Sequence, residues 1–83
     1  MRLVFMGKLG AAVPDDFSEI TVPGGVHTLA DLKEWIIGGQ PSLARLMKVT
    51  PIRLVVNHLV AHDLSQLVHD NDEIAFLPPM SGG

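Results

Sequence analysis

The chain contains no cysteine and no tyrosine, and one tryptophan among its 83 residues. Without cysteine it has no disulfide framework, no thiolate zinc site and no cysteine nucleophile. Cations are also scarce, because 6 lysines and arginines stand against 9 acidic residues and form no basic run. Nucleic acid and anionic membranes both bind clustered cations. The sequence therefore argues against either of them as a main partner.

Long hydrophobic runs are absent as well. No apolar stretch approaches the ~18 residues that cross a bilayer, and the first residues lack the apolar core and cleavage site of a secretory signal. We therefore expect a cytoplasmic protein. Hydrophobic residues make up 47% of the chain and charged residues 18%, which is typical of a folded protein rather than a disordered one. A chain of 83 residues allows one domain with a thin core.

Short apolar stretches separated by turn residues predict the strands. The first two are expected to pair as an antiparallel hairpin, and Asn57-His58 is expected to form a tight turn between two later ones. Pro78 ends the last strand, because proline has no N–H for the ladder. The expected strands are 3–6, 18–22, 52–56, 59–61 and 73–77.

One main helix is expected between the second and third strands. Thr28 is the expected N-cap, with Asp31 at the capping-box position. Gly38-Gly39 is expected to end the helix in the left-handed conformation. A short second helix should begin at Pro41. The apolar faces of the two helices are expected to comprise Leu29, Leu32 and Ile36 in the first, and Leu43, Leu46 and Met47 in the second.

This order of elements predicts an α+β domain, with a mixed sheet of four to five strands packed on one main helix. The first and last strands could lie side by side in parallel, as in the ubiquitin-like β-grasp fold. We expect the β-grasp domain to span residues 1–77 and a flexible C-terminal Gly-Gly tail to span residues 78–83.

The tail has the most unusual composition in the chain. Pro78 and Pro79 favour an extended exit from the sheet, and the segment from Pro78 onward reaches roughly 20 Å when extended. Gly82 and Gly83 have no Cβ, so the tip is thin and its terminal carboxylate is unhindered. Such a tip fits a narrow channel in another protein. The alternative is a frayed terminus without a role.

The segment from Phe76 to Gly83 closely resembles the C-terminus of molybdopterin synthase small subunits, which are ubiquitin-like sulfur carriers. The likeness extends to residues 52–57 and 70–74. Where that family has glycine in the loop before the last strand, this chain has Asn71, a residue type that tolerates positive φ. The loop from Lys8 to Asp16 departs more from the family.

The resemblance implies a chemistry at the last residue. An E1-like activating enzyme would adenylate the Gly83 carboxylate with ATP, and a sulfur donor would displace AMP to leave a thiocarboxylate. The tail would then enter the large catalytic subunit of molybdopterin synthase and give its sulfur to precursor Z, cyclic pyranopterin monophosphate, in molybdenum cofactor biosynthesis. Gly82 would give clearance, while Met80 and Ser81 would line the path of the tail.

The resemblance also implies the molecule's place in an assembly. The expected complex is a heterotetramer of two small and two large subunits, in which this chain is a non-catalytic sulfur donor. It would supply no side-chain active site and bind no cofactor or metal itself. Strand alternation turns one set of apolar residues away from the helix, which suits a docking surface. The expected partner-binding residues are Val4, Val55, Ala75, Leu77, Pro78, Pro79, Met80 and Ser81.

Three other interpretations stay open. The chain could be a sulfur carrier of another pathway such as thiamin, although the run Phe-Leu-Pro-Pro at 76–79 disfavours this. It could be a ubiquitin-like protein modifier, or a plain interaction module whose Gly-Gly is incidental. A metal site at His58 and His62 is not expected, because their i, i+4 spacing has that meaning only on a helix.

Overall fold

The computed structural model describes residues 1–15 and 17–79. The expectations for Met80, Ser81, Gly82 and Gly83 therefore lie outside the described residues. The elements, in chain order, are β1 (Arg2–Phe5), the 3₁₀ helix η1 (Gly7–Ala12), α1 (Leu29–Gly39), α2 (Pro41–Val49), β2 (Arg53–Val56), β3 (Leu59–Ala61) and β4 (Glu73–Leu77).

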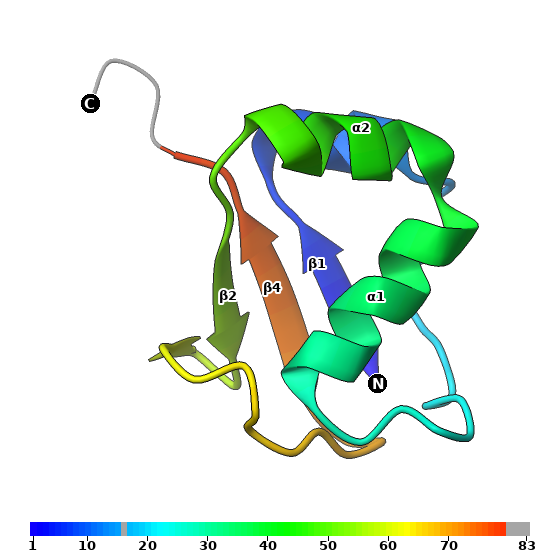
Figure 1. Cartoon of the computed structure of the whole chain (residues 1–83), viewed down its shortest axis with the longest axis vertical. Helices are drawn as coiled ribbons and strands as arrows, with labels where there is room; N and C mark the ends of the chain where they lie inside the picture. The colour runs from blue at the N-terminus through cyan, green and yellow to red at the C-terminus, as the bar shows by residue number, and fades with distance from the viewer. Residues whose placement is uncertain (16, 80–83) are drawn as a thin grey trace.

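The strands form one 4-stranded sheet in the order β1-β4-β2-β3. β1 runs parallel to β4, whereas β2 is antiparallel to both β4 and β3. Figure 1 shows β1 and β4 pointing the same way at the centre of the view, with β2 reversed beside them. The expected parallel pairing of the first and last strands is therefore confirmed, and the last strand occupies an interior position.

α1 begins at a complete capping box. Asp31 N–H donates to Thr28 Oγ1 at 3.1 Å, and Thr28 N–H donates to Asp31 Oδ2 at 3.2 Å. Leu29, Leu32 and Ile36 are fully buried, as their spacing predicts.

α1 ends at Gly39, as expected, but not through the left-handed glycine that was expected to end it. Gly38 and Gly39 are not left-handed, because the glycines with positive φ in the described chain are Gly7 and Gly25. Gln40 instead caps the helix with φ −133° and ψ 84°. The following residue is Pro41, whose ring disfavours the α conformation in the residue before it. Proline therefore separates α1 from α2.

The core lies between the sheet and the two helices. Phe76 of β4 and Leu43 of α2 are fully buried, while Leu46 and Met47 pack at the edge of the core. An aromatic row crosses this layer from the sheet to the surface of α1. Its centroid separations are 4.8 Å for Phe76–Phe5, 6.0 Å for Phe5–Phe17 and 6.1 Å for Phe17–Trp35. The row links the central strand to the helix layer.

The expected strand at 18–22 does not form. Its antiparallel pairing with the start of the chain is limited to one bridge, between Arg2 and Glu19. Hydrogen bonds from the Leu3 N–H to the Ser18 carbonyl at 2.8 Å and from the Ile20 N–H to the Met1 carbonyl at 3.0 Å flank that bridge. Farther along, the Val22 N–H donates to the Asp70 carboxylate at 2.8 Å. This donor is therefore satisfied by a side chain from the loop before β4, and the hairpin stops after one bridge.

The sequence also predicts the backbone conformation of two turns, one at Asn57-His58 and one at Asn71. Asn57 and His58 both have positive φ, 50° and 72°, and join β2 to β3 as the tight turn expected there. Asn71 is of a residue type that tolerates positive φ, but its own φ is not positive. Its turn closes instead through the Asp72 N–H, which donates to the His69 carbonyl at 3.1 Å.

Candidate functional site

The base of the tail is the point where the chain leaves β4. β4 ends at Leu77, and Pro78 follows it half-buried. The Pro78 ring lies beside Gly7, where a Cβ would approach Pro78 Cγ to 3.3 Å. Gly7 also has φ +57°, which glycine adopts without strain. Glycine at position 7 thus both turns the chain after β1 and leaves room for the proline.

Hydrogen bonds fix this exit from both sides. The Met6 N–H donates to the Phe76 carbonyl at 3.0 Å, just before the chain turns into η1. On the other side, Leu77 is in register with Arg53 of β2. A strand held by two neighbours has little freedom to fray, so the base of the tail is anchored. Pro79 is exposed and is the last described residue.

The sheet has an open face, turned away from α1. Register aligns three of the expected docking residues in one row across three strands: Val4 pairs with Ala75, and Ala75 pairs with Val55. All three are half-buried. Leu77 lies two residues beyond Ala75 on the same face, because side chains alternate along a strand. The row therefore leads toward the base of the tail.

One member of this row was missed from the sequence. Val60 of β3 pairs with Val55 and is 45% exposed, so it extends the row to the sheet edge. The signal was available, because a two-residue turn at Asn57-His58 sets the register of the hairpin. We call Val4, Val55, Val60, Ala75 and Leu77 the open-face row.

Most of the charged side chains near the open-face row lie at the end of the sheet farthest from the tail. Arg2 and Glu73 pair across β1 and β4 with 3.7 Å between Nε and Oε2, and His58 Nε2 lies 3.8 Å from Glu73 Oε1. The Arg2 and His58 side chains are largely solvent-exposed and Glu73 is half-buried, so these pairs contribute little stability. They give the open face a polar margin where the parallel strands begin.

Among the described residues, the carboxyl groups with a lowered pKa are those of Asp31, Asp63 and Asp72, and each has a structural partner. Hydrogen bonds from the backbone N–H groups of His27 and Thr28 lower the pKa of Asp31, and those from Ser65 lower the pKa of Asp63. Both belong to caps or turns. Within residues 1–15 and 17–79, no three His, Asp or Glu side chains gather as metal ligands, and no helix has the length and apolar character to cross a bilayer.

Comparisons with known proteins agree with this geometry. The model of the ThiS family matches residues 3–83. A molybdopterin synthase sulfur carrier subunit of Chlamydomonas reinhardtii is 37% identical over 59 residues, which cover 71% of this chain and 69% of that protein. The resemblance identified from the sequence is thereby confirmed.

The fold also has a counterpart among solved structures. The crystal structure of SAMP1 from Haloferax volcanii superposes with a TM-score of 0.72 at 24% identity, covering 98% of this chain and 96% of that one. The ubiquitin-like β-grasp fold expected from the sequence is confirmed by this match. With a family match over nearly its whole length, the chain belongs to the ThiS family.

Proposed function

We propose that this chain is the sulfur carrier subunit of molybdopterin synthase and that Gly83 is its reactive residue. The observation that supports this most is the anchored exit of the chain from β4. Gly7 and the paired edges of β4 hold Pro78 at the end of an interior strand, and Gly82-Gly83 follows four residues later. The ThiS match includes these last residues.

The proposed chemistry has two steps. The Gly83 carboxylate attacks the α-phosphorus of ATP, forming an acyl adenylate and releasing pyrophosphate. A sulfide sulfur then attacks the acyl carbon, AMP leaves, and a thiocarboxylate remains. Because the chain has no cysteine, it cannot hold this sulfur as a persulfide of its own. The activating enzyme binds the ATP, so the carrier needs no nucleotide site.

The proposed partners follow from two surfaces. The open-face row docks on the large subunit, and the tail passes from Pro78 and Pro79 into that subunit's active site. There the thiocarboxylate sulfur is transferred to cyclic pyranopterin monophosphate. The assembly would contain two small and two large subunits in the cytoplasm. An E1-like enzyme would use the same tail for activation, so the two partners would bind in turn.

Intact-mass spectrometry tests the proposal. The purified chain is incubated with an E1-like activating enzyme, ATP and sulfide, and should gain the difference between one sulfur and one oxygen atom. Deleting Gly83 should abolish the gain, and omitting ATP should do the same. The modified chain should then convert cyclic pyranopterin monophosphate when a large subunit is added.

Other outcomes would separate the alternatives. A mass gain without sulfur transfer to the pterin would favour a sulfur carrier of another pathway, such as thiamin. Covalent adducts between Gly83 and lysines of other proteins would favour a protein modifier. An unchanged mass under every condition would refute the proposed chemistry and leave an interaction module.

A further inference from the structure

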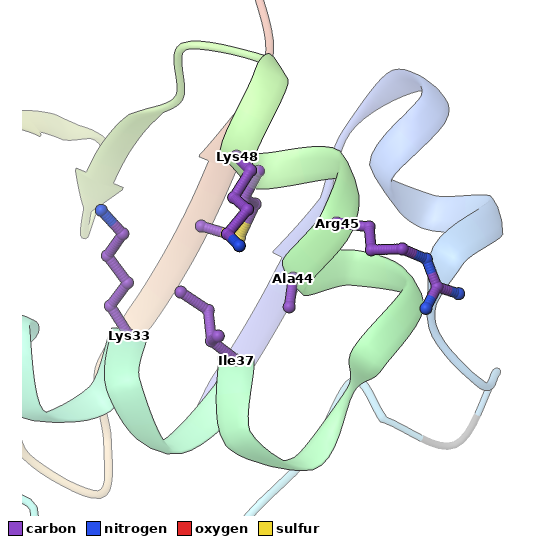
Figure 2. A pocket seen from close by; sticks show the side chains of 6 residues that line it. Lys33, Ile37, Ala44, Arg45 and Lys48 are labelled. Carbon is purple, nitrogen blue, oxygen red and sulfur yellow. The ribbon is translucent and has the colours of Figure 1, made fainter.

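The helical side of the molecule contains a groove that the sulfur-carrier proposal does not use. It lies between α1 and α2, has a volume of about 310 Å³, and is lined by Lys33, Ile37, Ala44, Arg45, Met47 and Lys48. Figure 2 shows Ile37 rising from α1 and Ala44 reaching down from α2, with Lys33 and Lys48 beside them. We call this the α1–α2 groove.

A second hollow of about 270 Å³ adjoins it and shares Lys33 and Met47. This hollow continues past Ile52 to the edge strand β3, where Ala61 lies opposite the buried Leu54. The two hollows therefore form one continuous depression from the helix pair to the edge of the sheet. Met47, which both hollows share, packs at the edge of the core beneath them.

Charge is segregated at this depression. Lys33, Arg45 and Lys48 line the α1–α2 groove, and no Asp or Glu is among the lining residues of either hollow. Arg53 borders the second hollow, but it pairs with Leu77, so strand alternation turns its side chain toward the open face. The chain as a whole has a net charge of −3. Lys48 and Arg45 are exposed on α2, and Arg45 extends away from the gap between Lys33 and Lys48 in Figure 2. Two lysines, Lys33 and Lys48, thus flank the apolar floor of the α1–α2 groove on an otherwise acidic protein.

We propose that the α1–α2 groove binds an acidic segment of a partner protein that inserts an apolar side chain between Lys33 and Lys48. Charge complementarity specifies the acidic flanks, since opposite potentials steer association and fix register. The apolar floor formed by Ile37, Ala44 and Met47 specifies the anchor, since a buried apolar side chain supplies most of the affinity in such contacts.

Two other occupants fit the groove less well. A free phosphate is usually held by converging backbone N–H groups or a planar guanidinium fork, whereas this floor consists of aliphatic and thioether side chains. A membrane surface requires large apolar side chains that project beyond the cations. Here Ile37 and Met47 are half-buried and recessed between two helices.

A peptide library displayed on phage tests the proposal with the full-length chain as bait. Selected peptides should contain acidic residues around an apolar anchor. Titrated into the ¹⁵N-labelled chain, they should shift amide resonances of residues 33–37 and 44–48. Double charge reversal, Lys33→Glu with Lys48→Glu, should raise the dissociation constant by about tenfold or more, and the effect should shrink at high salt.

Matched variants make the result decisive. Lys8→Glu reverses a cation of η1 outside the depression and should leave peptide affinity within about twofold. Ile37→Gln should weaken binding while both lysines remain. The proposal is overturned if no peptide is enriched, if enriched peptides lack acidic residues, or if the double reversal leaves affinity unchanged. It is likewise overturned if inorganic phosphate or phosphatidylglycerol vesicles bind these residues and the peptides do not.

Discussion

The side-chain amide of Asn57 donates a 2.9 Å hydrogen bond to the buried carboxylate of Asp72. Through its carbonyl oxygen, Asn57 also accepts the Glu73 N–H at 2.9 Å. The Asp72 carboxylate in turn accepts the His69 N–H at 2.8 Å. One short network thus ties the β2–β3 turn to the start of β4, the strand from which the tail leaves.

Asn57→Ala should destabilise the fold. It leaves Asp72 and the Glu73 N–H without this partner and places alanine at φ 50°. We expect a loss of about 2–3 kcal/mol, measured by urea unfolding. Asn71→Ala is the matched control, because Asn71 is exposed in the neighbouring turn and has ordinary φ. It should change stability by less than ~0.5 kcal/mol, and equal losses in the two variants would contradict the role of the network.

Acid should weaken the fold through the same carboxylate. Burial acts to raise the pKa of Asp72, but hydrogen bonds from Asn57 and His69 outweigh it and lower the pKa below its ordinary value of 3.8. The unfolded chain therefore binds this proton at a higher pH than the folded chain. Stability should be constant above about pH 5 and fall as the pH drops through 3.8 toward the lowered value.

Urea titrations at a series of pH values measure this dependence. In Asp72→Asn, which cannot ionise at this position, the fall below pH 5 should be shallower, although the variant is less stable at neutral pH. The capping carboxylate of Asp31 also has a lowered pKa, so some acid sensitivity should remain. An acid slope identical to wild type in Asp72→Asn would show that Asp72 is not linked to folding.

Val55→Glu should weaken docking to the large subunit. It introduces a charge in the middle of the open-face row, between Ala75 and Val60. Burying that charge in an apolar interface should cost about 2 kcal/mol, a ~30-fold rise in the dissociation constant measured by calorimetry. Val49→Glu places the same charge at an 80% exposed valine at the end of α2. Equal affinity of the two variants would exclude the open-face row as the docking surface.

Gly7→Ala and Gly38→Ala should change stability in opposite directions. Alanine at position 7 meets both φ +57° and the Pro78 ring at 3.3 Å, which should cost about 1–2 kcal/mol. Alanine at position 38 meets no atom within 4 Å on α1 and should add up to about 1 kcal/mol. Thermal unfolding measures both. If the carrier proposal is right, Gly7→Ala should also slow sulfur transfer, because it displaces the base of the tail.

Local patterns predicted the elements that local interactions determine. The capping box at Thr28 and Asp31, the spacing of Leu29, Leu32 and Ile36, and the two-residue turn at Asn57-His58 each depend on residues close in sequence. The parallel β1–β4 pair followed from the order of elements rather than from either strand alone. The open-face row followed from alternation, except for Val60, whose place needed the register between β2 and β3.

The failures involve partners that are distant in sequence. Val22 is satisfied by Asp70, 48 residues away, and no alternation in 18–22 contains that information. η1 spans 6 residues, too few for a helical period to show. The α1–α2 groove was not predicted because its cations are scattered over residues 33–48 and meet only when the helices pack. The left-handed conformation expected at Gly38-Gly39 does not occur, because Pro41 is enough to end α1 without it.

The aromatic row has a practical consequence. The chain has one tryptophan and no tyrosine. That tryptophan, Trp35, is 39% exposed and lies at the opposite end of the aromatic row from Phe76. Its emission is therefore a label-free optical signal from a single known position. Because the row passes through both β1 and β4, loss of the strand pair that anchors the tail should alter the colour and intensity of that emission.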